Sequence, residues 1–305
     1  MLAATWNQEL ARGQGDLCGE EGMWNGYNGW YAPSMNTHRS PFSGRNFEYY
    51  SQDGVHAGLI TANVIAGVSS RGVYPYIKHM ALNDQETHRD HLGIVTWADE
   101  QTIREIYLKP FEMTVTDNYV DVKYNEPIYD SNGEITGYTM KTAENMPAAT
   151  GIMSSFNRIG TTWAGGSYSL LTEVLREEWG FNGFVLTDYE VSNYMFTGQC
   201  LAAGGDAKLK TVGLSGNFLF GYSLEGNAED QAYAHEAAHH ILYTVVNSAA
   251  MNGYVHGVEY VNGFAYYKII LIVWDVLAAA GVAVLIFFLV KKIKRNRMIK
   301  SGNNR

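Results

Sequence analysis

The first part of the chain alternates between short apolar runs and longer amphipathic stretches. Apolar runs that end in polar residues, as buried strands do, are Asn28–Asn36, Tyr74–Leu82, Ala149–Asn157 and Gly183–Asp188. Apolar residues at helical spacing fill the stretches between them, at residues 56–72, 99–115 and 169–180. We expect the first helix to end at Gly72 and the last to begin with Ser169 as its N-cap. Strands that alternate with helices predict βα units around a parallel sheet.

Polar side chains follow each of the four predicted strands. Asn36 follows the first, Lys78 and His79 the second, Ser154 the third and Asp188 the fourth. Parallel α/β folds gather their chemistry at the carboxyl ends of the strands, so we expect one site there. Asp188 is the strongest candidate, because a carboxylate at the end of an apolar strand is costly to bury without a partner.

Two segments depart from this alternation. Residues 121–147 are polar and rich in turn residues, which predicts a hairpin or a long excursion. Ile269–Val290 is apolar except for Asp275 and is long enough to span a bilayer as a helix. The basic run Lys291–Lys300 follows at once, and such runs favour the cytoplasmic side. We therefore expect a single-pass anchor in the cell membrane, with the preceding residues outside and the C-terminus in the cytoplasm.

Composition narrows the possible functions. The chain has 305 residues and a net charge of −9, which argues against binding to nucleic acid. The 21 Tyr and 7 Trp residues suit a core, and their rings also suit stacking on sugars. Two cysteines far apart give neither a disulfide framework nor a CxxC metal site. The N-terminus lacks the pattern of a signal peptide, so either an export segment lies upstream of Met1 or the inferred topology is wrong.

Several strings in this chain occur in the order of a known family. They are "NTHRSPFSGRNFEYYSQDG", "IKHMALNDQETHRD", "EQTIREIYLKPFE", "MSSFNRIGTTW" and "LLTEVLREEWGFNGFVLTDYE". Together they resemble glycoside hydrolase family 3, in its β-glucosidase and β-xylosidase branch, over roughly residues 1–253. The resemblance implies an α/β fold with a TIM-type (β/α)8 barrel, incomplete here and followed by one transmembrane helix. It implies hydrolysis of terminal β-linked sugars with retention, without a cofactor or a metal.

The resemblance also assigns roles to single residues. Asp188 matches the catalytic nucleophile, which forms a covalent glycosyl-enzyme. The positions that match sugar-binding residues are Arg45, Lys78, His79, Arg89, Met153 and Tyr189. Phe156 stands where the family more often has Tyr, and a Phe cannot donate a hydrogen bond to the nucleophile. Alternatively, Arg45 and Glu48 form only an ion pair in a loop, and Met153 is plain core.

The same resemblance indicates missing parts. We expect a partial barrel at residues 1–225, a closing helix and linker at 226–268, the transmembrane helix at 269–290 and the basic tail at 291–305. The early barrel, and the glutamate that serves as acid/base, are expected in other segments. The chain is therefore expected to be a fragment of a larger enzyme, or to act with a partner chain that supplies the acid/base. Its expected partners are an oligosaccharide or β-glycoside and the lipid bilayer.

Two other interpretations remain open. "HEAAHH" contains the HExxH pattern, in which His235 and His239 bind zinc and Glu236 acts as general base, with Glu259 as a third ligand. The same segment resembles the helix that closes the family's barrel, which favours an amphipathic helix with incidental histidines. A third interpretation is a carbohydrate-binding remnant at the membrane without catalytic activity.

Overall fold

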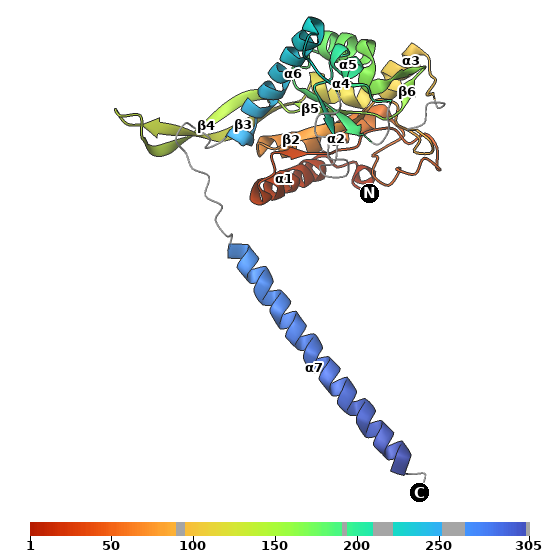
Figure 1. The fold of residues 1–305 in the computed structure, drawn as a ribbon, viewed down its shortest axis with the longest axis vertical. Coiled ribbons are helices and arrows are strands. Elements are labelled where there is room, and N and C mark those ends of the chain that lie inside the picture. Colours follow the sequence, from red (N-terminus) through yellow and green to blue (C-terminus); the bar gives the residue numbers. More distant parts are fainter. Residues whose placement is uncertain (90–94, 191–193, 210–221, 252–265, 303–305) are drawn as a thin grey trace. The chain divides into compact units, whose positions relative to one another are not determined.

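The computed structural model describes residues 1–89, 95–190, 194–209, 222–251 and 266–302, and it contains two compact units, Met1–His256 and Gly257–Arg305. In the first unit five parallel strands form a curled sheet (Figure 1). Their spatial order is β1 (Gly29–Trp30), β2 (Tyr74–Met80), β5 (Gly151–Ser154), β8 (Phe184–Tyr189) and β9 (Ala207–Leu209). The predicted parallel sheet is confirmed, and β9 is a strand that the apolar pattern did not predict.

Helices connect and cover the strands. The longer ones are α1 (Gln8–Asn25), α2 (Gly54–Ser70), α4 (Lys109–Thr116), the π-helix η4 (Ser169–Glu178), α5 (Thr197–Ala202) and α6 (Ala228–Val246). Short helical turns are η1 (Ala3–Thr5), η3 (Ala164–Gly166) and η5 (Ala249–Met251). The Asp53 side chain caps α2 by accepting the His56 N–H at 2.9 Å, and Gly72 follows the helix with a φ of +84°, as its predicted end requires.

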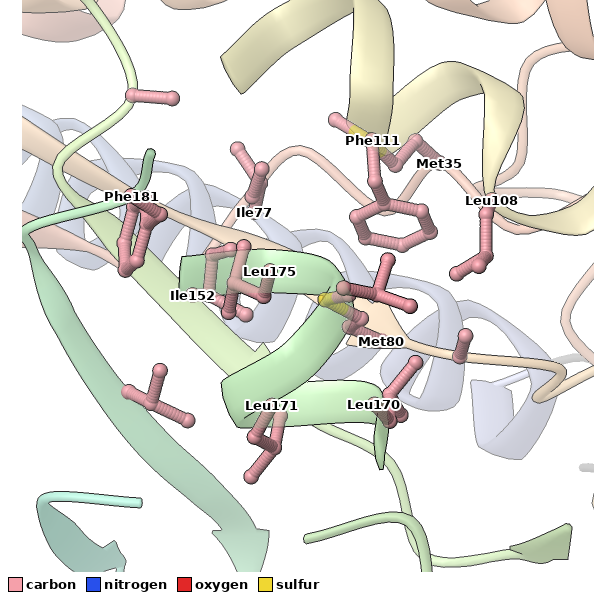
Figure 2. Packing of buried hydrophobic residues seen from close by; sticks show 14 of the residues in the cluster. Met35, Ile77, Met80, Leu108, Phe111, Ile152, Leu170, Leu171, Leu175 and Phe181 are labelled. Atoms are coloured by element: carbon pink, nitrogen blue, oxygen red, sulfur yellow. The ribbon is translucent and has the colours of Figure 1, made fainter. Parts of the chain in front are cut away.

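Alternate strand residues face opposite sides of the sheet. On the outer face Ile77, Ile152 and Val185 belong to one buried cluster with residues of α4 and η4, and Figure 2 shows Ile77 and Ile152 among Phe111, Leu171 and Leu175. On the inner face Tyr76, Met153 and Leu186 form a second cluster. Asp188 lies two residues beyond Leu186 on β8, so the strand period places it on the inner face.

Three local predictions differ from the structure. The helix expected at 99–115 is divided into α3 (Glu100–Thr102), a π-helix η2 (Ile103–Tyr107) and α4, in which Pro110 has no N–H to continue the helical ladder. Ser169 does not cap η4 but is its first residue, and the hydroxyl of Ser167 accepts the Leu170 N–H at 3.4 Å at that end instead. Of the strand expected at 28–36 only Gly29–Trp30 pairs as β1; Pro33 lacks an N–H, and Ser34 forms an isolated bridge to Lys78.

The polar segment for which a hairpin or a long excursion was expected is a hairpin. Strands β3 (Tyr119–Tyr129) and β4 (Ile135–Pro147) pair antiparallel and extend away from the parallel sheet (Figure 1). Asp130 closes the turn, because its Oδ1 accepts the N–H groups of Asn132 and Glu134 at 2.8 and 2.9 Å. A smaller hairpin joins β6 (Arg158–Ile159) and β7 (Thr162–Trp163).

The second unit contains one long helix, α7 (Tyr266–Gly302). Its segment Lys268–Arg295 is long and apolar enough to cross a membrane. It includes the predicted span Ile269–Val290, and the helix continues into the basic run without a break.

Candidate active site

Asp188 is the second-last residue of the apolar strand β8, and its side chain is nearly buried, 11% exposed. Its Oδ1 accepts the backbone N–H of Tyr189 at 2.7 Å. Its Oδ2 is buried and accepts no hydrogen bond from the described residues. Burial raises the pKa of Asp188, although the Tyr189 N–H and the charges of Arg89, Arg45 and Lys78 act in the opposite direction. One oxygen of this carboxylate is thus left for a ligand.

His79 lies beside that free oxygen. Its Nε2 is 3.4 Å from Asp188 Oδ2 and 3.1 Å from a terminal nitrogen of Arg45. Since a guanidinium only donates, Nε2 is the acceptor of that bond and the ring proton sits on Nδ1, which is 3.4 Å from Asn36 Oδ1. Burial, and then the positive charges of Arg45, Lys78 and Arg89, lower the pKa of His79 well below its usual value. The contact with Asp188 is therefore not an ion pair at neutral pH.

Asn36 fixes the backbone of His79. Its Oδ1 accepts the His79 N–H at 2.9 Å, and its Nδ2 donates to the His79 carbonyl at 2.8 Å. Both residues are almost completely buried, so these two bonds satisfy backbone groups that water does not reach. Asn36 follows the first strand and His79 lies on the second, so the pair joins two neighbouring strand ends.

Arg45 and Glu48 form the ion pair that the sequence left as an alternative, and they also belong to the site. Arg45 Nε lies 2.6 Å from Glu48 Oε1, and Ser34 Oγ donates to the other oxygen of Glu48 at 2.6 Å. Burial alone would raise the pKa of Glu48, but the hydrogen bonds from Arg45 and Ser34 outweigh it and lower the value. Glu48 is thus held as an anion that orients Arg45 toward His79.

Arg89 approaches Asp188 from the loop after β2. One terminal nitrogen lies 4.0 Å from Asp188 Oδ2, 3.0 Å from Glu86 Oε1 and 3.0 Å from Asn83 Oδ1. Glu86 also lies 3.6 Å from Arg45, so a single carboxylate links both arginines. Sequence reasoning missed the roles of Asn83 and Glu86, although both lie in the string "NDQETHR" that carries the family resemblance.

The other expected sugar-binding residues line the same region. Lys78 on β2 pairs with Met153 on β5. Burial lowers the pKa of the Lys78 ammonium, and the negative charge of Glu48 opposes this shift. Met153 is 2% exposed and packs in the inner-face cluster, so it is core as well as the neighbour of Lys78. Tyr189 is partly buried and packs against the cluster that contains Phe156.

Phe156, where the family more often has Tyr, supports an arginine. The guanidinium carbon of Arg89 lies 4.3 Å from the centre of its ring. A cation over an aromatic face is attracted to the negative ring quadrupole. The ring therefore helps to hold Arg89 beside Asp188, a role that needs no hydroxyl group.

The HExxH pattern lies on α6, away from the residues around Asp188. His235, Glu236 and His239 are exposed, and no cluster of three metal-ligating side chains occurs within the described part of the chain. Glu259 lies outside the described residues. The neighbouring His240 instead bonds Asp206 Oδ1 through Nδ1 at 2.8 Å, and Arg176 lies 2.8 Å from the other oxygen of Asp206. This buried network ties α6 to the sheet.

A cavity of about 370 Å³ lies away from Asp188, near the amino ends of the strands. The hairpin β3–β4, the end of α6 and Gly72 line it. It contains none of the strand-end groups described above. We assign the site from the converging charges around Asp188 rather than from the size of this cavity.

A half-barrel of parallel strands, with a buried carboxylate and arginines at the carboxyl ends, defines part of a TIM-type enzyme domain. Comparison with known proteins agrees. One similar structure is beta-glucosidase 3B from Thermotoga neapolitana, solved in complex with glycerol. The two structures superpose with a TM-score of 0.66 and 32% sequence identity. The match covers 83% of this chain and 32% of that chain. It is 35% identical over 189 residues to Beta-glucosidase A of Butyrivibrio fibrisolvens, covering 62% of this chain and 19% of that protein.

A Beta-glucosidase of Rhizobium radiobacter is 35% identical over 208 residues, which are 68% of this chain and 21% of that protein. Residues 1–129 match the glycosyl hydrolase family 3 N terminal domain. The chain carries part of a family 3 N-terminal domain, and the resemblance stated from its motifs is confirmed. It spans about a fifth of the length of the curated relatives that it matches.

Proposed function

We propose that this chain is the nucleophile-bearing part of a retaining β-glycosidase that acts on terminal β-linked sugars. The observation that carries the proposal is the free Oδ2 of Asp188, buried among His79 and Arg89 at the end of β8. Its relatives are named as beta-glucosidases, and one of the similar structures, beta-glucosidase 3B, was also solved with glucose.

In this mechanism Asp188 attacks the anomeric carbon, and the leaving oxygen departs with a proton from a second carboxyl group. The glycosyl–Asp188 ester then reacts with water, which restores the carboxylate and releases the sugar with retained configuration. Arg45, Lys78 and Arg89 are positioned as cationic donors around the carboxylate. They bind sugar hydroxyls and keep the nucleophile ionised.

The second carboxyl group is proposed to come from another domain or from a partner chain. The two glutamates nearest to Asp188 in the network, Glu48 and Glu86, are both paired with arginines. A carboxylate held as an anion by arginine is a poor proton donor. A retaining enzyme needs an acid about 5 Å from the nucleophile, and neither glutamate is free to serve.

A mechanism-based label tests the nucleophile without the acid. A 2-deoxy-2-fluoro-β-glucoside with a dinitrophenolate leaving group needs no proton donor, so the full chain should form a stable ester that mass spectrometry maps to Asp188. Asp188→Asn should remain unlabelled. Labelling of another residue, or equal labelling of both proteins, would refute the proposal.

The engaged glutamates also favour a second candidate function, sugar binding without turnover. It predicts that calorimetry detects D-glucose binding to the full chain, while the fluoro-glucoside gives no ester and an aryl β-glucoside is not hydrolysed. The label therefore separates the two candidates.

We also propose that α7 anchors the chain in a cell membrane, with residues 1–256 outside and the basic run in the cytoplasm. Its apolar segment supports an anchor by length and composition, and the basic run at one end supports this orientation.

A further inference from the structure

Tyr49 lies in the loop after β1, directly after Glu48, and is not used by the mechanism above. Its side chain is buried, and its hydroxyl donates to the Asn83 carbonyl oxygen at 2.9 Å. The Asn83 Nδ2 donates back to the hydroxyl oxygen of Tyr49 at 3.1 Å. Because Asn83 belongs to the loop after β2, this pair of bonds joins the loop that carries Arg45 to the loop that carries Arg89.

The direction of these bonds fixes the side-chain amide of Asn83. A tyrosine hydroxyl has one proton, and here that proton goes to the Asn83 carbonyl. The hydroxyl oxygen can therefore only accept from the amide, so the Nδ2 of Asn83 faces Tyr49. The amide oxygen Oδ1 is left on the other side, where it accepts from a terminal nitrogen of Arg89 at 3.0 Å. Turned the other way, the amide would set its N–H groups against a guanidinium that only donates.

The position of Arg89 depends on that oxygen. The nitrogen that Asn83 accepts from is also the one that lies 3.0 Å from Glu86 Oε1 and 4.0 Å from Asp188 Oδ2. Asn83 is completely buried, so water does not replace a partner that it loses. A change at the Tyr49 hydroxyl is thus transmitted through one amide to the guanidinium beside the candidate nucleophile.

We propose that Tyr49 is a positioning residue for sugar binding: its hydroxyl orients the Asn83 amide, and the Asn83 amide holds Arg89 in place. Tyr49 acts through two other side chains and is not a catalytic residue. The part of this inference that concerns the sugar rests on the proposed function, whereas the link from Tyr49 to Arg89 does not.

Labelling of the full chain by the 2-deoxy-2-fluoro-β-glucoside tests the effect on the sugar. Tyr49→Phe keeps the ring and removes the hydroxyl, so the half-saturating concentration of the label should rise about threefold to tenfold. The limiting rate at saturation should stay within about twofold of wild type, because Arg89 lies too far from Asp188 for a hydrogen bond and acts on the sugar hydroxyls. Unchanged constants, or a loss confined to the limiting rate, would overturn the inference.

Thr244→Val is the matched control. The hydroxyl of Thr244 is also fully buried and also donates to a backbone carbonyl, that of Thr150, at 2.7 Å. Thr150 precedes β5, so this contact lies at the amino ends of the strands, away from Asp188. The control measures what the loss of a buried hydroxyl does by itself. It should leave both labelling constants unchanged, and a rise like that of Tyr49→Phe would overturn the inference.

A double-mutant cycle tests whether Tyr49 acts through Asn83. Asn83→Ala removes the intermediary, so adding Tyr49→Phe to it should change the half-saturating concentration no further. If the effects of the two substitutions multiply, as they do for independent sites, Tyr49 does not act through Asn83 and the inference is wrong.

Urea unfolding provides a readout that needs no sugar. Arg89→Lys keeps the charge but loses the guanidinium, and it should lower the free energy of unfolding in the wild-type background. In the Tyr49→Phe background the same substitution should cost less than half as much, because Arg89 has already lost its fixed partner. This result in a chain that takes up no label would sustain the link and count against the proposed function. Equal effects of Arg89→Lys in both backgrounds would overturn the inference, whether or not the chain is labelled.

Discussion

The guanidinium of Arg89 lies between Phe156 and the candidate nucleophile, 4.3 Å from the ring centre and 4.0 Å from Asp188 Oδ2. Glu86 and Asn83 hold the same group from the side, each at 3.0 Å. The position of this charge thus depends on a ring, a carboxylate and an amide. Each can be changed separately.

Replacing the ring tests its contribution. Phe156→Leu removes the aromatic face and should slow labelling by the fluoro-glucoside about threefold to tenfold, because a cation–π contact that is still partly solvated is worth about 1 kcal/mol. Phe156→Tyr keeps the ring and is the matched control, with a rate at least equal to wild type. The second-order rate constant of labelling measures both. An unchanged rate in Phe156→Leu, in a protein that remains folded, would show that Asn83 and Glu86 suffice to hold Arg89.

The candidate nucleophile Asp188 should reduce the stability of the fold. The pKa of Asp188 is raised on folding by burial, so the unfolded chain ionises first as pH rises and the folded state loses stability until it ionises too. Asp188→Asn should therefore have a higher Tm than wild type at neutral pH, by a few degrees, and the gain should shrink toward about pH 4. Thermal unfolding across pH measures this. A lower Tm for Asp188→Asn at neutral pH would contradict the pKa argument.

The two adjacent histidines of α6 should differ in their effect. His240→Gln disturbs the buried network around Asp206 and should lower the free energy of unfolding by about 1–3 kcal/mol. His239→Gln changes an exposed side chain and should be neutral within about 0.5 kcal/mol. Urea unfolding of the two variants compares them directly. The zinc interpretation instead predicts that His239→Gln lowers the zinc content of the purified protein.

The membrane proposal has its own test. The full chain, reconstituted with vesicles, should stay with the lipid after alkaline carbonate washing, because an apolar helix of this length inserts firmly. A chain ending at residue 256 should remain in solution. Replacing Leu277 and Val284 by Lys should shift the full chain toward the soluble fraction, since charges near the centre of a span are costly. Release of the wild-type chain by carbonate would contradict the proposal.

Much of the fold follows from local pattern. The apolar runs at 74–82, 149–157 and 183–188 predict β2, β5 and β8, because a strand buried on both faces must be apolar throughout. The helix α1 was not predicted. Its contact with α2 depends on glycines: a Cβ added at Gly15 would lie 2.1 Å from the Val64 carbonyl oxygen, so close packing rather than apolar spacing holds it.

The sequence by itself determined that polar residues gather at the strand ends, because parallel strands bring their carboxyl ends to one edge, and its motif strings predicted Asp188 as the centre of a site there. Only the tertiary structure decided which charged side chains pair with one another and which atoms are left for a ligand. Glu48 and Glu86 are bound to arginines, His79 is neutral with its proton on Nδ1, and the Oδ2 of Asp188 accepts no hydrogen bond from the residues that the structure describes. These properties depend on burial and on distances between loops far apart in the chain, which residue order does not contain.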